Sequence, residues 1–520
     1  MAETIKVKVF RYDPDTDNSP HYETYEVPYV EGMVVLDVLN YIYENLDGTF
    51  AYRWACRAGQ CGSCATIING KPSISCRKTV EKGKPLTIAP LLQFPVVKDL
   101  VVNLDRGLRR INRIRPYVER SRKPSRPEII KKEDIEPVKE IRECIECWAC
   151  VSACPVVGEA WQEFAGPLSH RQLARLEFDK RDVEDRVKMA FHEGLYDCTT
   201  CGTCKEVCPK EIDIPRKAIE KMRALAVREG LGPLEGQLSF IEGIKKTGRS
   251  VERQTIPLLE QVPEIVNVTD PIDEIGLFTG CLIDYRLQET GLNMIEVLRR
   301  NRVRVHIPKA QSSCASPAFR SGVVDVGYDQ VKKNVEVFEK LGLKKVVAGC
   351  AGCTKTMKQD FPEVMLEVRN EEPKFKVFDF CEYLVNEIGL KNLNTKELGE
   401  VKMTVTYHDP CHLNRVQGIY DEPRQLIKLV PGVKFVEMEE ADRCCGAGGG
   451  VRTGRRPLSM MLARRKAEFI IKSGAEAVVT ECPFCYIQLR DILNQLGYEH
   501  IKVLNVPDLL AMSYKQGEKA

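Results

Sequence analysis

Cysteine is the residue type that says most about chemistry in this chain, because 22 of its 520 residues are cysteines and they occur in spaced clusters. The first cluster has the pattern Cys56-x4-Cys61-x2-Cys64-x11-Cys76. This spacing predicts a plant-type [2Fe–2S] cluster, since one tight loop supplies three converging thiolates. Gly59 and Gly62 would let backbone N–H groups approach the sulfurs. A structural zinc site is the alternative, although zinc more often takes two separated Cys-x2-Cys pairs.

Two runs farther along the chain have the spacing of bacterial ferredoxins. They are Cys144-x2-Cys147-x2-Cys150-x3-Cys154-Pro155 and Cys198-x2-Cys201-x2-Cys204-x3-Cys208-Pro209. In such an arrangement the fourth cysteine of each run binds the cluster of the other run. One [4Fe–4S] cluster is therefore assigned to Cys144, Cys147, Cys150 and Cys208. The second is assigned to Cys198, Cys201, Cys204 and Cys154. Cluster loading should stabilise the fold, because the crossing joins two separate segments.

The C-terminal half contains an internal repeat, in which Cys281 and Cys411 are 130 positions apart. The second copy holds five thiols, at Cys411, Cys444, Cys445, Cys482 and Cys485. The first copy holds four, at Cys281, Cys314, Cys350 and Cys353, because Ser313 stands where the adjacent pair would begin. Five thiolates exceed the need of one cubane, so we expect the substrate chemistry in the second copy. A zinc or cubane site with one spare thiol is the alternative there, and the first copy suits structural zinc and a cluster equally.

Other polar residues lie near the second set of cysteines. Two histidines, His408 and His412, flank Cys411. We expect structural hydrogen bonds from them rather than proton transfer. Three arginines near the ligand loops are either binding groups for an anionic substrate or solvated charges; they are Arg415, Arg443 and Arg452. The glycine-rich stretch 446–450 would leave room for a ligand.

The elements that position these cysteines change in character along the chain. Alternation at 5–12 and 21–29 predicts two strands and the spacing at 34–46 predicts a helix, which is the order of a β-grasp ferredoxin. Residues 140–230 indicate helices. Each repeat alternates short apolar strands with amphipathic helices, as a parallel α/β domain does, and its ligand cysteines follow strand ends.

The predicted fold is therefore multidomain, α+β and α/β. Its expected parts are a [2Fe–2S] ferredoxin domain at 1–105, a helical two-cluster domain at 106–235, a linker at 236–272, a degenerate repeat at 273–398 and a complete repeat at 399–520. Cys381 aligns with Pro507 of the other copy, which favours a packed core cysteine over a ligand.

Composition excludes several other classes of protein. Hydrophobic residues make up 43% and charged residues 29%, as in ordinary globular chains, and the net charge is +3. This charge gives no reason to expect a nucleic-acid or acidic-membrane partner. The start of the chain lacks a signal-sequence pattern, and no apolar run approaches the roughly 20 residues of a membrane span. We expect a cytoplasmic protein whose cysteines serve metal or redox chemistry rather than disulfides.

The first 235 residues resemble the iron–sulfur subunit of the succinate dehydrogenase/fumarate reductase family, including an interdomain segment at Phe94–Asn103. In one respect the chain departs from the family. Its last cysteine run is complete, whereas quinone-linked members alter one spacing there and hold a [3Fe–4S] cluster beside the quinone. The resemblance therefore implies electron transfer without implying quinone reduction.

The C-terminal half resembles the tandem CCG domains of the heterodisulfide reductase family, as found in its B subunit. In that family the complete cysteine set holds a non-cubane [4Fe–4S] cluster that acts on a disulfide, which implies the same role for the set that begins at Cys411. Together the two halves resemble the B subunits of the thiol:fumarate reductase family of methanogenic archaea. The resemblance implies oxidation of coenzyme M and coenzyme B thiols to the heterodisulfide. Electrons would then pass to a flavoprotein partner that carries FAD and reduces fumarate to succinate.

Two rival functions remain at this stage. One is a pure electron-transfer subunit of a succinate, lactate or glycerol-3-phosphate type dehydrogenase, with a quinone or another acceptor. The other is a scaffold whose C-terminal cysteines bind only zinc. No Gly-x-Gly-x-x-Gly fingerprint opens a βαβ unit in this sequence, so any flavin belongs on a partner.

Overall fold

The structure is a computed structural model that describes residues 3–121, 123–124 and 126–519. The chain forms two compact units, one made of residues 1–198 and 202–222 and the other of 199–201 and 223–520. Within the described ranges, no helix combines the length and apolar character that crossing a bilayer requires.

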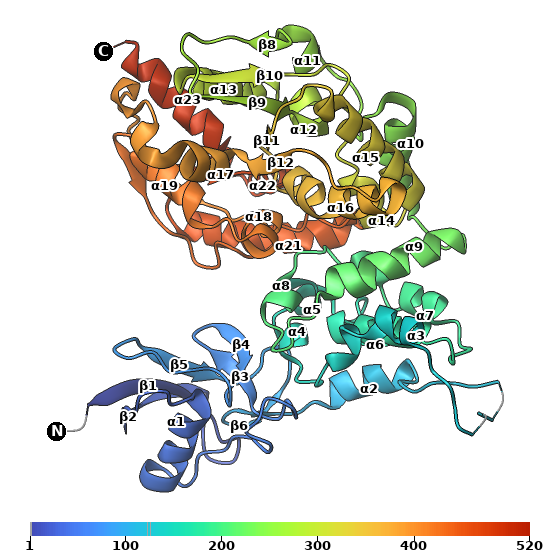
Figure 1. Cartoon of the computed structure of the whole chain (residues 1–520). Coiled ribbons are helices and arrows are strands. Elements are labelled where there is room, and N and C mark those ends of the chain that lie inside the picture. Colours follow the sequence, from blue (N-terminus) through green and yellow to red (C-terminus); the bar gives the residue numbers. More distant parts are fainter. Residues whose placement is uncertain (1–2, 122, 125, 520) are drawn as a thin grey trace. The chain divides into compact units, whose positions relative to one another are not determined.

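The first unit begins with a five-stranded sheet in the order β2-β1-β5-β3-β4 (Figure 1). The strands are β1 (Thr4–Arg11), β2 (His21–Pro28), β3 (Ala65–Ile68), β4 (Lys71–Ile74) and β5 (Leu86–Ala89). Strand β1 runs antiparallel to β2 and parallel to β5. Its alternate residues Ile5, Val7 and Val9 are buried, because successive side chains of a strand point to opposite faces. Helix α1 (Val35–Tyr41) continues as a π-helical turn, η1 (Ile42–Leu46), so the β-grasp prediction is confirmed.

The rest of the first unit is built from short helices around the cysteine runs. They include α4 (Ala149–Ser152), α5 (Pro155–Ala160), α6 (Pro167–Glu177), α7 (Arg186–His192), α8 (Thr203–Glu206) and η5 (Pro215–Glu220). Helix α5 begins at the proline of the first run, where the missing N–H costs no hydrogen bond. Phe94 packs edge to face against Trp148 and Trp161, with centroid distances of 5.7 and 5.3 Å.

The second unit contains two sheets with the same strand order. The first sheet follows β12-β11-β9-β10 with β8 added at its edge, and the second follows β16-β15-β13-β14. The first set is β8 (Ile265–Val266), β9 (Asp273–Phe278), β10 (Val303–His306), β11 (Lys345–Ala348) and β12 (Lys376–Asp379). The second is β13 (Met403–Tyr407), β14 (Val433–Phe435), β15 (Ala477–Thr480) and β16 (Lys502–Asn505). All neighbours in the shared order are parallel, as the repeat predicts, and only β8 is antiparallel.

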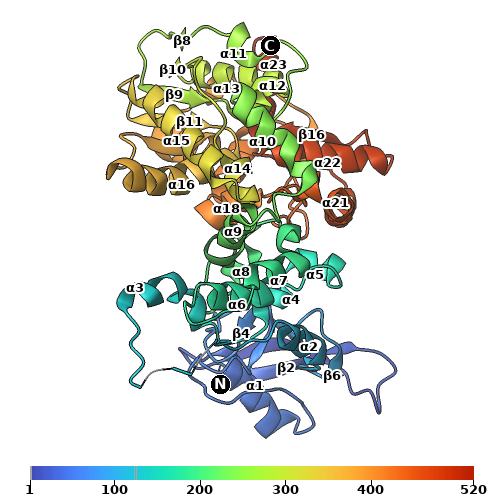
Figure 2. The ribbon, with the colours of Figure 1, turned by 90° about the vertical axis from the view of Figure 1, so that its right-hand side faces the viewer.

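The two repeats pack on one another through a shared core. Helix α13 (Gln288–Arg300) of the first repeat contacts α23 (Val506–Gly517) of the second. Across this contact Thr290 donates a hydrogen bond to Asp508 at 3.1 Å, and Asn301 donates to the Tyr514 hydroxyl at 3.0 Å. In the second repeat, α21 (Arg456–Lys472) and α22 (Pro483–Gln495) lie side by side (Figure 2).

The stretch 236–272 differs from the linker that its glycines and prolines predict. Most of α10 (Glu235–Thr247) lies in it, followed by α11 (Leu258–Gln261) and β8. Phe240, Ile241 and Ile244 of α10 are buried against Ala318 of the first repeat. Burial of this apolar face outweighs the low helix propensity of the two glycines within the helix.

Candidate iron–sulfur and thiol sites

The N-terminal cysteine loop turns its backbone amides toward its own sulfurs. The N–H groups of Ala58 and Gln60 donate to Cys56 Sγ at 3.4 and 3.3 Å, and the N–H of Cys76 donates to Cys64 Sγ at 3.4 Å. Cys56 and Cys61 are exposed, whereas Cys64 and Cys76 are buried. Such donors stabilise the thiolates of an anionic cluster, so the loop suits a [2Fe–2S] group.

Electrostatics differ within this loop. Hydrogen bonds from Ser63 and Cys56 lower the pKa of Cys61 to about 6, and burial raises the pKa of Cys64 to about 12. The thiolate that a metal needs therefore forms most readily at the exposed edge of the loop.

The same loop lies against the first bacterial-type run of the first unit. A Cβ atom on Gly62 would come within 2.9 Å of the Cα and Cβ atoms of Cys147, and Gly62 has a left-handed φ of +71°. Cys64 and Cys76 also belong to a small apolar cluster that includes Ile145 and Cys147. The candidate [2Fe–2S] ligands and the first candidate [4Fe–4S] ligands are thus direct neighbours.

A side chain at position 62 should separate these neighbours. We expect Gly62→Ala to destabilise the ferredoxin domain by about 1–3 kcal/mol, because the methyl group meets backbone atoms that cannot move cheaply. The midpoint of chemical unfolding, followed by visible circular dichroism of the [2Fe–2S] group, measures this change. Gly70→Ala is the matched control, because Gly70 has a φ of +84° but a Cβ atom added there would meet nothing within 4 Å. Equal shifts of the unfolding midpoint in both variants would contradict the inferred effect of the contact between position 62 and Cys147.

Cys208 lies beside the first run rather than only beside its own. Burial raises the pKa of Cys147 to about 12, and the nearby sulfurs of Cys144 and Cys208 contribute to this rise. Burial likewise raises the pKa of Cys150 well above its ordinary value, with Cys147, Cys144 and Cys208 contributing. Cys208 therefore lies near the first run, which a crossing between the two runs would require.

The two bacterial-type runs share one local backbone conformation. Glu146 and Trp148 have left-handed φ values of 52° and 65°, and the matching Thr200 and Gly202 have values of 54° and 78°. In the first run this turn directs the N–H of Glu146 to Cys144 Sγ at 3.4 Å. Of the four cysteines predicted for the second [4Fe–4S] cluster, Cys201 and Cys204 are buried, and Cys154 and Cys198 are half-buried.

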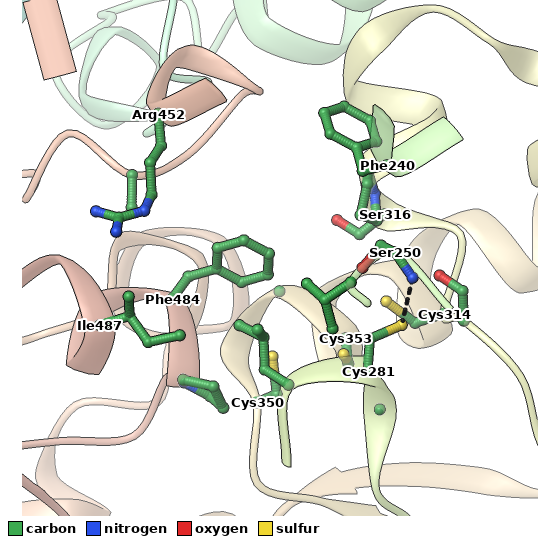
Figure 3. A pocket seen from close by; sticks show the side chains of 18 of the residues that line it. Phe240, Ser250, Cys281, Cys314, Ser316, Cys350, Cys353, Arg452, Phe484 and Ile487 are labelled. Carbon is green, nitrogen blue, oxygen red and sulfur yellow. Dashed lines mark hydrogen bonds between the residues drawn. The ribbon is translucent and has the colours of Figure 1, made fainter. Parts of the chain in front are cut away.

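A cavity of about 850 Å³ in the second unit is lined by cysteines of both repeats. Figure 3 labels the cysteines of the first repeat at this cavity. The first repeat contributes Cys281, Cys314, Cys350 and Cys353, and the second contributes Cys411, Cys444, Cys445, Cys482 and Cys485. Each set comes from strand ends: Cys350 directly precedes α16 (Ala351–Arg369), and Cys482 directly precedes α22. The parallel sheets thus bring their ligand loops to the same edge.

Within this cavity the sulfurs are close enough to share protons. Cys445 Sγ and Cys485 Sγ are 3.5 Å apart. The thiols of Cys350 and Cys485 donate hydrogen bonds to Cys482, which holds the pKa of Cys482 well below its ordinary value. The two cysteine sets therefore adjoin, because Cys350 belongs to the first repeat and Cys482 to the second.

The first-repeat set has its own sulfur contacts. The backbone N–H of Ser250 donates to Cys281 Sγ at 3.3 Å (Figure 3). The Cys353 thiol donates to Cys314 and lowers its pKa. Ser313, which replaces the first cysteine of the adjacent pair, is fully buried at the cavity wall, and its Oγ accepts from the N–H of Ala315 at 3.3 Å.

His408, for which the sequence predicts only structural hydrogen bonds, lies close to two sulfurs of the second-repeat set. One of its ring nitrogens lies within 4.8 Å of both Cys445 Sγ and Cys485 Sγ. The ring is buried, and neither nitrogen has a hydrogen-bond partner among the residues that the structure describes. Burial, with Lys466 and Arg415 nearby, holds its pKa well below the ordinary value. A neutral imidazole in this place can serve as a metal ligand or a hydrogen-bond donor to sulfur.

The remaining polar candidates divide into supporting and cavity-lining residues. Arg415 forms an ion pair with Asp442 at 3.0 Å, and Arg443 forms one with Glu440 at 2.8 Å, so both have structural partners. Arg452 lines the cavity, although its guanidinium pairs with Asp491. His412 also lines the cavity, and burial lowers its pKa.

The glycine-rich stretch 446–450 only partly leaves the room that its composition predicts. Residues 447–450 line the cavity, but a Cβ atom on Gly446 would meet the Ser459 carbonyl at 2.6 Å. A Cβ atom on Gly450 would meet the Gln237 side chain at 2.4 Å. Both glycines also have left-handed φ values, of +84° and +74°. These two positions therefore allow close packing of the loop rather than open space.

Three models of known protein families match parts of this chain. Residues 6–109 match the 2Fe-2S iron-sulfur cluster binding domain, and residues 140–212 match the 4Fe-4S dicluster domain. Residues 275–358 and 405–490 each match the cysteine-rich CCG domain. The chain is therefore an iron–sulfur oxidoreductase subunit in which ferredoxin-type domains precede tandem CCG domains.

Relatives identify the family more closely. The B subunit of fumarate reductase (CoM/CoB) from Methanothermobacter marburgensis is 41% identical over 510 residues, which is 98% of this chain and 99% of that protein. The chain belongs to the family of this subunit. The D subunit of dihydromethanophenazine:CoB–CoM heterodisulfide reductase from Methanosarcina mazei is 31% identical over 72% of this chain and 93% of that protein. The fumarate reductase iron-sulfur subunit of Haemophilus influenzae is 33% identical over 44% of this chain and 95% of that protein.

Proposed function

We propose that this chain is the subunit of a thiol:fumarate reductase in which coenzyme M and coenzyme B thiols are oxidised to their mixed disulfide. Two S–H bonds break and one S–S bond forms, which releases two protons and two electrons. A flavoprotein partner carrying FAD takes up both electrons, and fumarate with two protons becomes succinate. The observation that carries this proposal is the cavity whose wall holds the cysteines of both CCG repeats.

The cavity residues suit a group that holds two thiols side by side. We assign a non-cubane [4Fe–4S] group to Cys411, Cys444, Cys445, Cys482 and Cys485, since five neighbouring thiols exceed the need of a cubane. When bound, this group supplies soft metal sites for sulfur and accepts electrons one at a time. The first-repeat set would hold zinc or a further cluster. Holding both substrates in one cavity removes much of the entropic cost of bringing two thiols together.

Arg286 is the cavity residue best suited to the anionic part of a thiol substrate. It follows the helix that carries Cys281, α12 (Gly280–Tyr285), and it lines the cavity. Its Nη1 atom is buried and has no hydrogen-bond partner among the described residues. Coenzyme M carries a sulfonate and coenzyme B a phosphate, and a guanidinium binds either group with paired N–H donors.

Replacing this cation should weaken substrate binding more than turnover. We expect Arg286→Gln to raise the KM for one of the two thiols about 10-fold or more, because a charge-assisted hydrogen bond contributes about 1.5–3 kcal/mol. Steady-state kinetics with each thiol varied in turn measure the change. Arg299→Gln is the control, since Arg299 is an exposed helix residue paired with Glu296 at 2.7 Å. An unchanged KM for both thiols would rule out this role for Arg286.

Electrons would leave the thiol site through the three ferredoxin-type clusters, one [2Fe–2S] and two [4Fe–4S]. The neighbouring ligand loops of Cys147 and Gly62 support a relay between two of them, because close packing shortens the path.

A dye assay with the isolated subunit tests the proposal. Anaerobic protein is mixed with both thiols and a one-electron dye, and dye reduction that requires both thiols is the expected result. The absence of thiol-dependent dye reduction would favour the electron-transfer subunit that uses a quinone or another acceptor. Metal analysis distinguishes the proposal from the alternative of a scaffold whose C-terminal cysteines bind only zinc. That alternative predicts only about ten iron atoms per chain, from one [2Fe–2S] and two [4Fe–4S] groups.

A further inference from the structure

Three buried ligand groups meet outside the cysteine-lined cavity. Asp379 ends β12, Cys381 follows in α17 (Phe380–Glu382), and Glu481 directly follows β15. One carboxylate oxygen of each acid and the Cys381 sulfur all lie within 4.8 Å of one another. The exposed fractions of Asp379, Cys381 and Glu481 are 0%, 0% and 1%. The group therefore joins the strand ends of the two CCG repeats at a place that water does not reach.

The acids of this group lack the partners that burial normally demands. Asp379 Oδ1 accepts from the N–H of Cys381 at 3.0 Å, but Oδ2 has no hydrogen-bond partner among the described residues. Neither side-chain oxygen of Glu481 makes a hydrogen bond of good geometry within the described part of the chain, and the donors nearest to it are the Cys381 thiol and the Val506 N–H. The nearby Lys358 is already paired with Glu382 at 2.6 Å. Charged carboxylates that are buried with so few donors cost several kcal/mol, so either a bound cation or a proton must offset their charge.

The repeat supplies an internal comparison. When the two repeats are aligned, Asp379 corresponds to Asn505, Cys381 to Pro507 and Glu481 to Gly349. The symmetry-related place thus holds no acid and no thiol at these three positions. The three ligand groups therefore occur at only one of the two places that the repeat relates, so the CCG fold by itself does not account for them.

We propose that Asp379, Cys381 and Glu481 bind a divalent cation of the zinc class that links the two CCG domains. One thiolate and two carboxylates match the sulfur and oxygen ligands of zinc, which takes four ligands in a tetrahedron. The buried hydroxyl of Tyr407, at the end of β13, lies near enough to Cys381, Glu481 and Asp379 for their charges to raise its pKa. It has no hydrogen-bond partner among the described residues, so it is the candidate for the fourth ligand. None of these three residues lines the cavity, although Glu481 directly precedes Cys482, so the zinc of this site is additional to any bound by the first-repeat set.

A shared proton is the competing explanation for the unpaired acids. In the absence of a cation, burial raises the pKa of Asp379 to about 8 and that of Glu481 well above its ordinary value. Protonated carboxyl groups would tolerate burial without any metal. The two explanations differ in metal content and in the ligands around the metal.

The test uses the full-length protein, purified anaerobically with its clusters and supplied with Zn²⁺. Iron and zinc are counted by mass spectrometry, and zinc-edge X-ray absorption identifies the ligands. We expect zinc coordinated by one sulfur with oxygens, whether or not a four-sulfur zinc signal accompanies it. Cys381→Ser and Glu481→Gln should each remove about one zinc ion per chain and leave iron unchanged. Glu382→Gln, at the neighbouring acid that pairs with Lys358, should keep the zinc.

Several results would overturn this site. They are a wild-type protein without zinc, a zinc spectrum with only four-sulfur coordination, and zinc retained in both Cys381→Ser and Glu481→Gln. If both variants fail to fold, the wild-type spectrum decides alone, because the mixed sulfur–oxygen signal requires ligands other than the cavity cysteines. Thiol oxidation by the wild-type protein is measured separately, so failure of the proposed reaction would leave this result readable.

Discussion

Cys445→Ser should abolish thiol-dependent dye reduction by the isolated subunit, with a loss on the order of 100-fold or more. Cys445 belongs to the second-repeat set, and its sulfur lies 3.5 Å from that of Cys485 and near the ring of His408. A serine hydroxyl has a similar size but does not supply a thiolate, so the metal group of this site would be lost or altered. The three ferredoxin-type clusters have other ligands and should remain.

Electron paramagnetic resonance provides the second measurement for this variant. In the wild-type protein, oxidised and treated with each thiol singly, we expect a substrate-dependent signal that Cys445→Ser lacks. Ser313→Ala is the control, because Ser313 occupies the matching adjacent-pair position of the first repeat and carries no thiol. Full thiol oxidation by Cys445→Ser would contradict this prediction and would indicate that the reaction takes place at the first-repeat cysteines. Loss of the ferredoxin-type signals as well would instead indicate a general folding defect.

The sequence predicts best what depends on short spacings. The fold class, the β-grasp order and the two parallel repeats are confirmed, because each follows from the local alternation of apolar residues or from a pattern that recurs along the chain. The stretch 236–272 is less predictable. Its glycines and prolines indicate a linker, whereas the burial of Phe240, Ile241 and Ile244 against the first repeat stabilises a helix.

Features that combine distant strand ends could not be predicted from the sequence. Glu481 and Asp379 come from different repeats, and the alignment of Cys381 with Pro507 argues against any ligand role for the thiol. Only the packing of the two sheets brings the three side chains together. His408 shows the same limit at closer range: its position before Cys411 is visible in the sequence, but its approach to Cys445 and Cys485 depends on where the loops after β13, β14 and β15 meet.

The predicted crossing between the two ferredoxin-type runs can be tested by replacing the fourth cysteine of each run. Cys208→Ser should remove one [4Fe–4S] group, about four iron atoms, because Cys208 lies with Cys144, Cys147 and Cys150. That group would be the one next to the [2Fe–2S] loop, since Gly62 packs directly against Cys147. Reduced clusters that are close neighbours broaden and relax each other's paramagnetic signals. The broadening of the [2Fe–2S] signal by this neighbour is called the interaction signal. We therefore expect the interaction signal of the [2Fe–2S] cluster to disappear in Cys208→Ser.

Cys154→Ser is the matched variant for this experiment, since Cys154 is the fourth cysteine of the first run. With crossed ligands, Cys154→Ser removes the other [4Fe–4S] group and leaves the interaction signal of the [2Fe–2S] cluster intact. With uncrossed ligands the two results exchange, although each variant still loses about four iron atoms. Iron content alone therefore cannot distinguish the two ligand schemes, whereas the magnetic neighbour of the [2Fe–2S] cluster can. The crossed scheme also predicts that either variant destabilises both runs, because each cluster then joins two segments of chain.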